Sequence, residues 1–228
     1  MPDTVCLDST YLSANPTWHV EDSPWKARQV LGMLARHNIR PYRVAEVGCG
    51  AGEILQQLSL ELPEALFTGF DISNAAIELA RTRENDRLHF FRLDIRETDQ
   101  KFDLLLLMDV VEHVEDCFGF LRGVREKAKY KILHIPLDMS VSQLVRNRIM
   151  AARRGVGHIH YFTKDTALAL LEDTGYQVKD SFYTPAYEIA PKDLSHRAMA
   201  LVRSVSMRIA ADSTAKILGG CPLLVLAE

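Results

Sequence analysis

The sequence lacks the features expected of a secreted or membrane-spanning chain. Its cysteines are few and far apart, at Cys6, Cys49, Cys117 and Cys221. None belongs to a C-x-x-C pair, so neither a disulfide framework nor a cysteine zinc site is expected. The apolar runs are far too short to span a bilayer, and no positively charged start leads into one, so no signal peptide is expected. We therefore expect a cytoplasmic protein.

A basic charge excess is also absent. The chain has 27 Lys and Arg residues against 30 Asp and Glu residues, a formal net charge of -3, which disfavours a general nucleic-acid binder. Its 228 residues, 47% of them hydrophobic, suffice for one α/β domain with a full core. We therefore interpret residues 1–228 as a single domain.

From residue 43 onward, strand-type and helix-type segments alternate. Strands are predicted at Arg43–Val47, Leu66–Phe70, Leu88–Leu93, Phe102–Met108, Lys131–Ile135, Gln177–Tyr183 and Leu223–Leu226. Helices are predicted at Glu53–Leu60, Asn74–Arg83, Asp116–Lys129 and Lys164–Asp173, after a first helix capped by Ser23. This alternation with short connections predicts an α/β fold with a parallel sheet and right-handed crossovers.

The most informative segment is the turn from Glu46 to Gly52, where an apolar strand runs into three alternate glycines and then into a helix. Glycines let a ligand approach the backbone closely, and a helix start offers unpaired N–H groups. A dinucleotide fingerprint requires glycine where Glu53 stands. The turn is G-x-G-x-G instead, and Glu46 is suited to hold an amino group.

Two further acids follow the next two strands. Asp71 ends the second strand, where a carboxylate can accept the hydroxyls of a ribose. Asp94 ends the third, where it can accept from an exocyclic amine such as that of adenine. Either acid alone could be a helix cap or a solvated loop residue. Three acids at successive strand ends, beside the glycine turn, favour a nucleoside ligand.

These motifs resemble a known family. Glu46-Val-Gly-Cys-Gly-Ala-Gly, Gly69-Phe-Asp-Ile-Ser, Leu93-Asp-Ile and Leu107-Met-Asp-Val-Val-Glu-His-Val are similar, in order, to the motifs of class I S-adenosylmethionine-dependent methyltransferases. They are nearest to the ubiquinone-biosynthesis O-methyltransferase-like branch. The resemblance covers roughly residues 43–183 and the final strand. It implies a Rossmann-like, doubly wound sheet of seven strands, the last antiparallel, with S-adenosylmethionine as cofactor and S-adenosylhomocysteine as product.

The resemblance also implies a cofactor-binding set: Glu46, Gly48, Cys49, Gly50, Gly52, Asp71, Ile72, Asp94, Ile95 and Met108. The glycines would pack against the methionine and ribose portions, and Asp71 would take the ribose hydroxyls. Ile72 would lie against adenine, with Asp94 and Ile95 at its edge. Residues 1–40 would fold over the cofactor through the aromatic side chains Tyr11, Trp18, His19 and Trp25, although simple core packing explains those residues equally well.

Methyl transfer from a sulfonium mainly requires alignment of the acceptor atom, and a general base helps only when the acceptor loses its proton late. We predict His113 as that base, since it follows the fourth strand at the carboxyl edge of the sheet. A helix-starting histidine bonded to a neighbour is the alternative. His158, His160 and Tyr161 are predicted to face the acceptor, because the two histidines fall on one side of an extended segment.

A metal site is the alternative use of the acids beside His113. Asp109, Glu112 and His113 could bind a hard divalent cation such as Mg²⁺ or Mn²⁺. Some relatives bind metal through a similar E-x-x-E-H run. In this chain the first acid is aspartate, which has the shorter reach, so we expect no metal.

Two helical insertions, residues 138–157 and 186–220, interrupt the alternation and are predicted to cover the site. From residue 139 to 164 there is no acid, and basic residues gather at Arg146, Arg148, Arg153, Arg154 and Lys164. The second insertion carries Arg197, Arg203 and Arg208 among apolar residues. A cap that attracts an anionic or amphipathic acceptor, a peripheral membrane contact and a pair of amphipathic helices with solvated arginines all fit this pattern.

Our leading hypothesis is an O-, N- or C-methyltransferase acting on a small molecule. Clustered arginines favour an RNA-directed methyltransferase as the alternative, while the acidic net charge weighs against it. A third reading is a module that binds S-adenosylmethionine without catalysis. Glu53 and the short glycine spacing disfavour a nicotinamide dehydrogenase.

Overall fold

The computed structural model describes residues 20–184 and 194–228, with the backbone alone for 194–199. The N-terminal aromatic residues Tyr11, Trp18 and His19, most of the predicted covering segment 1–40 before α2, and the start of the 186–220 insertion lie outside the described residues.

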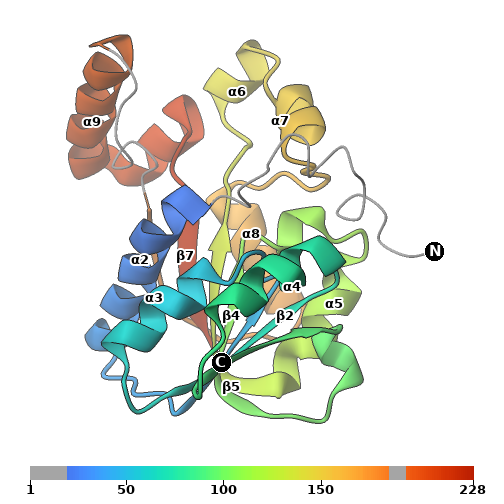
Figure 1. Ribbon diagram of the computed structural model, residues 1–228. Coiled ribbons are helices and arrows are strands. Elements are labelled where there is room, and N and C mark those ends of the chain that lie inside the picture. Colours follow the sequence, from blue (N-terminus) through green and yellow to red (C-terminus); the bar gives the residue numbers. More distant parts are fainter. Residues whose placement is uncertain (1–19, 185–193) are drawn as a thin grey trace.

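A sheet of seven strands forms the centre of the described chain (Figure 1). The strands are β1 (Arg43–Val47), β2 (Leu66–Asp71), β3 (Leu88–Arg92), β4 (Phe102–Met108), β5 (Ala128–Ile135), β6 (Val178–Tyr183) and β7 (Leu223–Ala227). Their order is β3-β2-β1-β4-β5-β7-β6, and β7 is antiparallel to both of its neighbours. The predicted seven-stranded, mostly parallel sheet with its last strand antiparallel is therefore confirmed.

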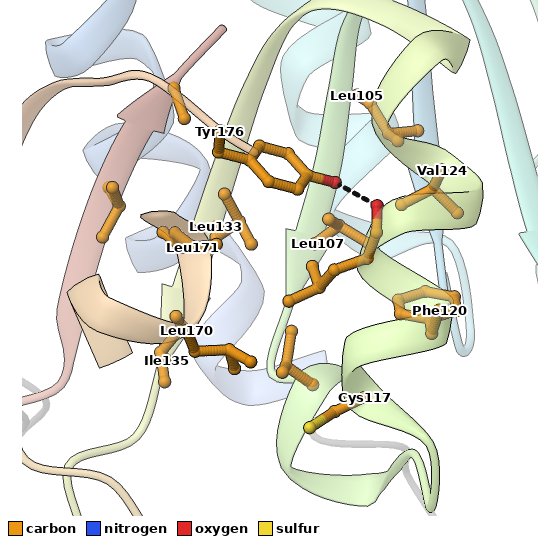
Figure 2. Close-up of a cluster of buried hydrophobic side chains, with 14 of the residues drawn as sticks. Leu105, Leu107, Cys117, Phe120, Val124, Leu133, Ile135, Leu170, Leu171 and Tyr176 are labelled. Atoms are coloured by element: carbon orange, nitrogen blue, oxygen red, sulfur yellow. Dashed lines mark hydrogen bonds between the residues drawn. The ribbon is translucent and has the colours of Figure 1, made fainter. Parts of the chain in front are cut away.

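Helices cover both faces of the sheet. On one face lie α2 (Ser23–Arg36), α3 (Glu53–Glu61) and α4 (Asn74–Ala80); on the other lie α5 (Cys117–Val124) and α8 (Lys164–Asp173). Strand β4 shows why its sequence is continuously apolar: Leu104 and Leu106 pack under α2 and α3, and Leu105 and Leu107 pack under α5 and α8. Figure 2 shows this second core.

The hydroxyl group of Tyr176 ends in that second core, where it donates a 2.8 Å hydrogen bond to the Leu121 carbonyl oxygen (Figure 2). The ring is nearly fully buried. A buried hydroxyl that lacked a partner would destabilise the fold, so this bond lets an aromatic side chain fill the space between α5 and α8.

Short 3-10 turns account for several predicted boundaries that were wrong. They are η1 (Val20–Asp22), η2 (Arg81–Arg83), η3 (Ile95–Glu97), η4 (Val111–His113) and η5 (Arg125–Lys127). The helix predicted to reach Arg83 therefore ends at Ala80. The predicted helix Asp116–Lys129 is α5 alone, and Ala128 joins β5 because it is buried and pairs with Phe102 in the parallel ladder.

Polar side chains cap the starts of α4 and α8, whereas the predicted cap of the first helix does not. Ser73 and Thr163 cap α4 and α8, accepting hydrogen bonds from the N–H groups of Ala76 and Thr166. Ser23 was wrong as a cap: Asp22 precedes the helix, and Ser23 lies buried in its first turn.

The insertions are helical, as predicted. The first consists of α6 (Val141–Val145) and α7 (Ile149–Gly155), and the second contains α9 (Leu194–Leu218), which is kinked at Ala210. In Figure 1 these helices lie beyond the carboxyl edge of the parallel strands, above α2 and α5. They are therefore placed over the edge at which the predicted site residues end their strands.

The turn from β1 into α3 depends on close packing behind it. Gly52 precedes α3 with φ of 78°, in the left-handed region. A Cβ atom there would lie 2.3 Å from Cζ of Phe90, a fully buried residue of β3. Gly52 thus makes room for a core ring, and it does not line the pocket described below.

Replacing Gly52 by alanine should destabilise the protein by about 2–4 kcal/mol, because the new methyl group meets Phe90 and the backbone is left-handed. Urea denaturation measures the free energy of unfolding. The control is Gly32→Ala, on the exposed side of α2 with open space around it, which should stabilise by about 0.5–1 kcal/mol. Equal effects of the two substitutions would contradict this account.

Candidate active site

A pocket of about 660 Å³ lies at the carboxyl edge of β1, β2 and β4, within the size range of small-molecule sites. Of the predicted cofactor set, those that line it are Glu46, Gly48, Cys49, Gly50, Asp71, Ile72, Asp94 and Met108. His113 and His158 also line it, and α7 contributes Arg153. The structure thus brings most of the predicted residues together around one cavity.

Glu46, on β1, is buried at the base of the pocket. Its Oε2 atom accepts no hydrogen bond from any described residue. Burial raises the pKa of Glu46 well above its usual range, although the Lys26 ammonium acts in the opposite direction. A buried carboxylate oxygen without a partner is costly unless a ligand supplies a donor, so Glu46 is suited to receive a ligand's ammonium group.

Asp71, at the end of β2, is fixed by backbone donors on two sides. One carboxylate oxygen accepts the Gly50 N–H at 2.9 Å, and the other accepts the Ser73 N–H at 2.8 Å. These bonds partly oppose burial, which raises the pKa of Asp71. The carboxylate is therefore tied to the glycine turn, and its remaining lone pairs can accept the hydroxyls of a sugar.

Asp94 lines the pocket, but its carboxylate already binds Arg96. It accepts from the Arg96 N–H and forms an ion pair of 2.5 Å with the Arg96 guanidinium. Partial burial tends to raise the pKa of Asp94, but the Arg96 contacts outweigh it and hold the pKa below its usual value. The Ile95 side chain is fully buried in the core and does not line the pocket. The predicted place of Ile95 at the edge of adenine stays a prediction, which its backbone and not its side chain would have to fulfil.

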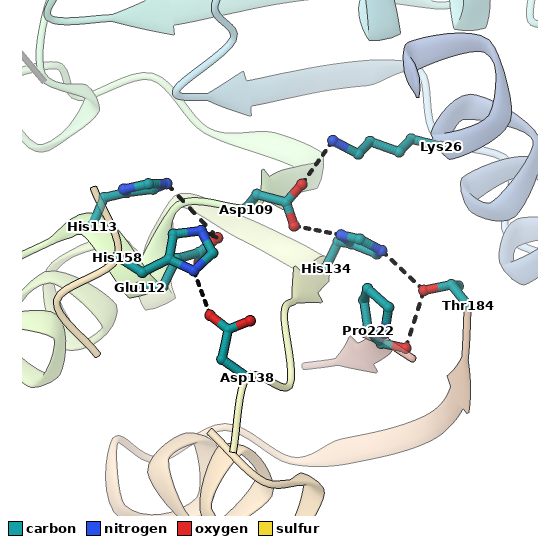
Figure 3. Close-up of polar contacts among 9 residues, drawn as sticks. All are labelled: Lys26, Asp109, Glu112, His113, His134, Asp138, His158, Thr184 and Pro222. Carbon is teal, nitrogen blue, oxygen red and sulfur yellow. Dashed lines mark hydrogen bonds and ion pairs between the residues drawn. The ribbon is translucent and has the colours of Figure 1, made fainter. Parts of the chain in front are cut away.

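Sequence reasoning missed a charged network beside Glu46. The Lys26 ammonium of α2 lies 2.7 Å from one oxygen of Asp109, and His134 Nδ1 of β5 lies 2.5 Å from the other (Figure 3). His134 Nε2 bonds in turn to the Thr184 hydroxyl at 2.9 Å. Burial favours a higher pKa for Asp109, but His134 and Lys26 outweigh it and hold the pKa far below its usual range. No local pattern links three residues so far apart in the chain.

Glu112 and His113 lie in η4, immediately after β4. Glu112 is fully buried, and burial together with the nearby Asp109 carboxylate raises its pKa well above the usual range. His113 Nδ1 lies 3.2 Å from the Gly157 carbonyl oxygen, and its Nε2 lies 3.9 Å from Glu112 Oε1. The predicted base is thus at the pocket, with one ring nitrogen bonded to the backbone.

Of the three residues predicted to face the acceptor, His158 alone lines the pocket. His160 Nε2 lies 2.9 Å from the Val114 carbonyl oxygen, and its ring stacks on Phe162. The Tyr161 hydroxyl donates to the His158 carbonyl oxygen at 3.0 Å. His160 and Tyr161 therefore shape the segment that carries His158 and do not contribute to the pocket wall.

The model of a methyltransferase domain family matches residues 22–181, a span that runs from the start of α2 into β6 and includes nearly all of the pocket residues. The chain belongs to this family. The resemblance to class I methyltransferases is confirmed, and S-adenosylmethionine is the cofactor of the class.

Similar proteins include the trans-aconitate 2-methyltransferase of Deinococcus radiodurans, 40% identical over 67 residues, which are 29% of this chain and 26% of that protein. The ubiquinone biosynthesis O-methyltransferase of Ruegeria pomeroyi is 29% identical over 113 residues, 45% of each. The chain thus matches between a quarter and a half of the length of these curated relatives.

Among solved structures, the magnesium protoporphyrin IX methyltransferase of Synechocystis with bound S-adenosylhomocysteine superposes with a TM-score of 0.62. The alignment covers 90% of this chain and 82% of that one, at 16% identity. Such similarity supports the fold. No helix in the described ranges is long and apolar enough to cross a membrane.

Asp109→Asn should lower the free energy of unfolding at pH 7 by about 2–3 kcal/mol, because the largely buried Lys26 and His134 lose their partly buried anionic partner. Asp109 has a lowered pKa, so its stabilising contribution is complete above the ordinary aspartate pKa and declines as the pH falls below about 4. The difference in free energy of unfolding between wild type and variant, measured by urea denaturation, should therefore become smaller as the pH is lowered from 7 to 3.5.

The control for Asp109 is Asp180→Asn, since Asp180 is similarly exposed but pairs with the more exposed side chains of Arg36 and His37. That change should cost less than about 1 kcal/mol. Equal stability of the two variants would contradict a stabilising role for the Lys26, Asp109 and His134 network. So would a difference in free energy of unfolding between wild type and Asp109→Asn that became larger at low pH.

Proposed function

We propose that this protein transfers a methyl group from S-adenosylmethionine to an anionic or amphipathic small molecule. The observation that carries the proposal is the buried Glu46 carboxylate, which has an oxygen without a hydrogen-bond donor at the base of the glycine-turn pocket. A dinucleotide pyrophosphate would be repelled by that carboxylate, whereas the α-ammonium of S-adenosylmethionine would pair with it.

The pocket residues fit the parts of this cofactor. Glu46 would hold the amino group, and Gly48 and Gly50 would let the ligand lie against the backbone. Asp71, held by the turn, would accept the ribose hydroxyls. Ile72 and Asp94 line the pocket where the base would lie. When bound, S-adenosylmethionine supplies an electrophilic methyl group on a sulfonium that is already an activated leaving group.

The contribution of the protein is then alignment and proton removal. Fixing the acceptor atom in line with the methyl group can lower a barrier by about 7–11 kcal/mol. His113 lines the same pocket with one ring nitrogen bonded to the Gly157 carbonyl oxygen. In the neutral ring that nitrogen carries the proton, so the other nitrogen can accept one. His113 is accordingly our candidate for the general base.

The acceptor would enter from the side of the first insertion. Arg153 of α7 lines the pocket, and the segment from 139 to 164 contains no acid. A cationic group at the mouth attracts anionic ligands. The relatives include a trans-aconitate and a ubiquinone-biosynthesis methyltransferase, which supports a small-molecule acceptor over RNA. The net charge of -3 supports it as well.

Glu46→Gln should weaken S-adenosylhomocysteine binding about 10- to 100-fold, the loss expected when an ammonium exchanges a charged partner for an amide. Because Glu46 has a raised pKa, wild-type affinity should increase as the pH rises from 5 to 8 and the carboxylate ionises. The variant should lose this pH dependence. Isothermal titration calorimetry measures both effects.

Glu53→Gln is the matched control, since Glu53 also lines the pocket but already pairs with Arg83 at 2.9 Å. Its affinity for S-adenosylhomocysteine should stay within about twofold of wild type. Binding of NAD by the folded protein, with no binding of S-adenosylmethionine or S-adenosylhomocysteine, would overturn the proposed function.

Arg153→Gln should raise the KM for the acceptor at least tenfold with a smaller change in kcat, because the arginine acts on binding at the pocket mouth. The acceptor is first found by labelled-methyl transfer into a metabolite extract separated on an anion exchanger. Label is expected in the retained, anionic fractions. Arg154→Gln, on the same helix but not in the pocket wall, is the control, and equal effects of both substitutions would contradict the assignment.

A further inference from the structure

Three potential metal ligands from two separate segments converge at the pocket wall. They are Glu112 and His113 of η4 and His158, which follows α7. One ligand atom from each lies within 4.8 Å of the others, and Figure 3 shows the side chains pointing toward one another. Both imidazoles line the pocket, while the carboxylate is fully buried behind them.

The buried carboxylate has no adequate partner within the described chain. Neither oxygen of Glu112 accepts a hydrogen bond there. The nearest nitrogens belong to His113 and His158, each with Nε2 at 3.9 Å from Oε1, which is too long for a hydrogen bond. The backbone of Glu112 is held in place, because its carbonyl oxygen accepts hydrogen bonds from the N–H groups of Ile159 and His160.

Both histidines are oriented from behind. His158 Nδ1 bonds to the Asp138 carboxylate at 2.5 Å, and His113 Nδ1 lies 3.2 Å from the Gly157 carbonyl oxygen. A neutral ring that donates through Nδ1 has a lone pair on Nε2. Metal-binding histidines are commonly oriented in this way: one ring nitrogen donates a hydrogen bond to a carboxylate or carbonyl oxygen, and the other binds the cation.

We propose that Glu112, His113 and His158 bind one divalent first-row transition cation of the Zn²⁺ type. Two imidazoles and one carboxylate favour such ions, whereas Mg²⁺ and Ca²⁺ prefer oxygen ligands. Ligand atoms around tetrahedral zinc lie about 3.4 Å apart. Each 3.9 Å separation therefore needs to shorten by about 0.5 Å, and the remaining pair of ligand atoms, which lies within 4.8 Å, by up to about 1.4 Å.

The set of ligands differs from the one the sequence suggested. Asp109 is excluded, because Lys26 and His134 occupy its two carboxylate oxygens. His158 replaces it, 49 residues further along the chain. Substituting an imidazole for a carboxylate changes the expected ion from a hard cation to a softer one.

Three protein ligands leave at least one coordination position, and the imidazoles border the pocket, so that position faces the acceptor side. Resting on the proposed function, this assigns the acceptor an oxygen donor, a hydroxyl or a carboxylate. The cation would lower the pKa of a bound hydroxyl and orient its oxygen. The proton of the hydroxyl would leave to solvent water, the oxygen would take the methyl group, and S-adenosylhomocysteine would depart; His113 would then be a cation ligand in place of the base.

The test uses the full chain, without a histidine tag and treated with chelator, titrated by calorimetry with ZnCl₂, CoCl₂ and MgCl₂. We expect one Zn²⁺ per chain with micromolar or tighter affinity and at least 100-fold weaker Mg²⁺ binding. Co²⁺ should give visible absorption bands of low coordination number. Glu112→Gln and His158→Ala should each weaken Zn²⁺ binding at least 100-fold, and Asp138→Asn about 10- to 100-fold.

His89→Gln is the control for adventitious binding, since His89 is an exposed histidine of β3, and it should leave Zn²⁺ affinity unchanged. S-adenosylhomocysteine affinity should be unchanged in Glu112→Gln, which verifies folding and keeps this test separate from the proposed function. Zn²⁺ binding that is absent, or that survives both Glu112→Gln and His158→Ala, would overturn the metal assignment even where S-adenosylhomocysteine still binds.

Discussion

The site depends on how the fold stabilises carboxylate groups that are shielded from water. Glu46, Asp71, Asp109 and Glu112 gather where β1, β2 and β4 end. Each would be costly to bury as an unpaired anion. Asp71 is stabilised by backbone N–H groups, and Asp109 by Lys26 and His134. Glu46 and Glu112 have no comparable partner among the described residues, and these two are the positions at which external cationic groups are expected.

Much of the framework could be predicted because it follows from local patterns. Strands β1 and β4 have the predicted bounds, since a continuously apolar segment between turns has few alternatives. The carboxyl ends of parallel strands meet at one edge, so Glu46 and Asp71 could be placed together before their contacts were known. Boundaries failed where helices tighten into 3-10 turns, as at Arg81 and Arg125, because both conformations suit the same residues.

Two residues of the predicted cofactor set lie outside the pocket wall for a different reason. Gly52 and Ile95 belong to the turn motifs after β1 and β3, yet Gly52 accommodates Phe90 and the Ile95 side chain fills the core. Packing against other strands decides which side of a turn faces the pocket. The periodicity of apolar residues in the sequence does not indicate that side. Lys26 and His134 lie on a helix and a strand more than 100 residues apart. Their pairing with Asp109 arises only in the tertiary structure, and no local sequence pattern indicates it.

The hydrogen bond between the Met139 N–H and the Phe162 carbonyl oxygen, at 3.1 Å, closes the first insertion at its base. The end of β5 and the start of α8 thus lie close together, so α6 and α7 form a module with a fixed attachment. Lengthening such a loop costs little closure entropy, and surface segments tolerate change better than the core. An exchange of this module would therefore change the part of the pocket wall that α7 supplies, while leaving the strands and the glycine turn beneath it unchanged.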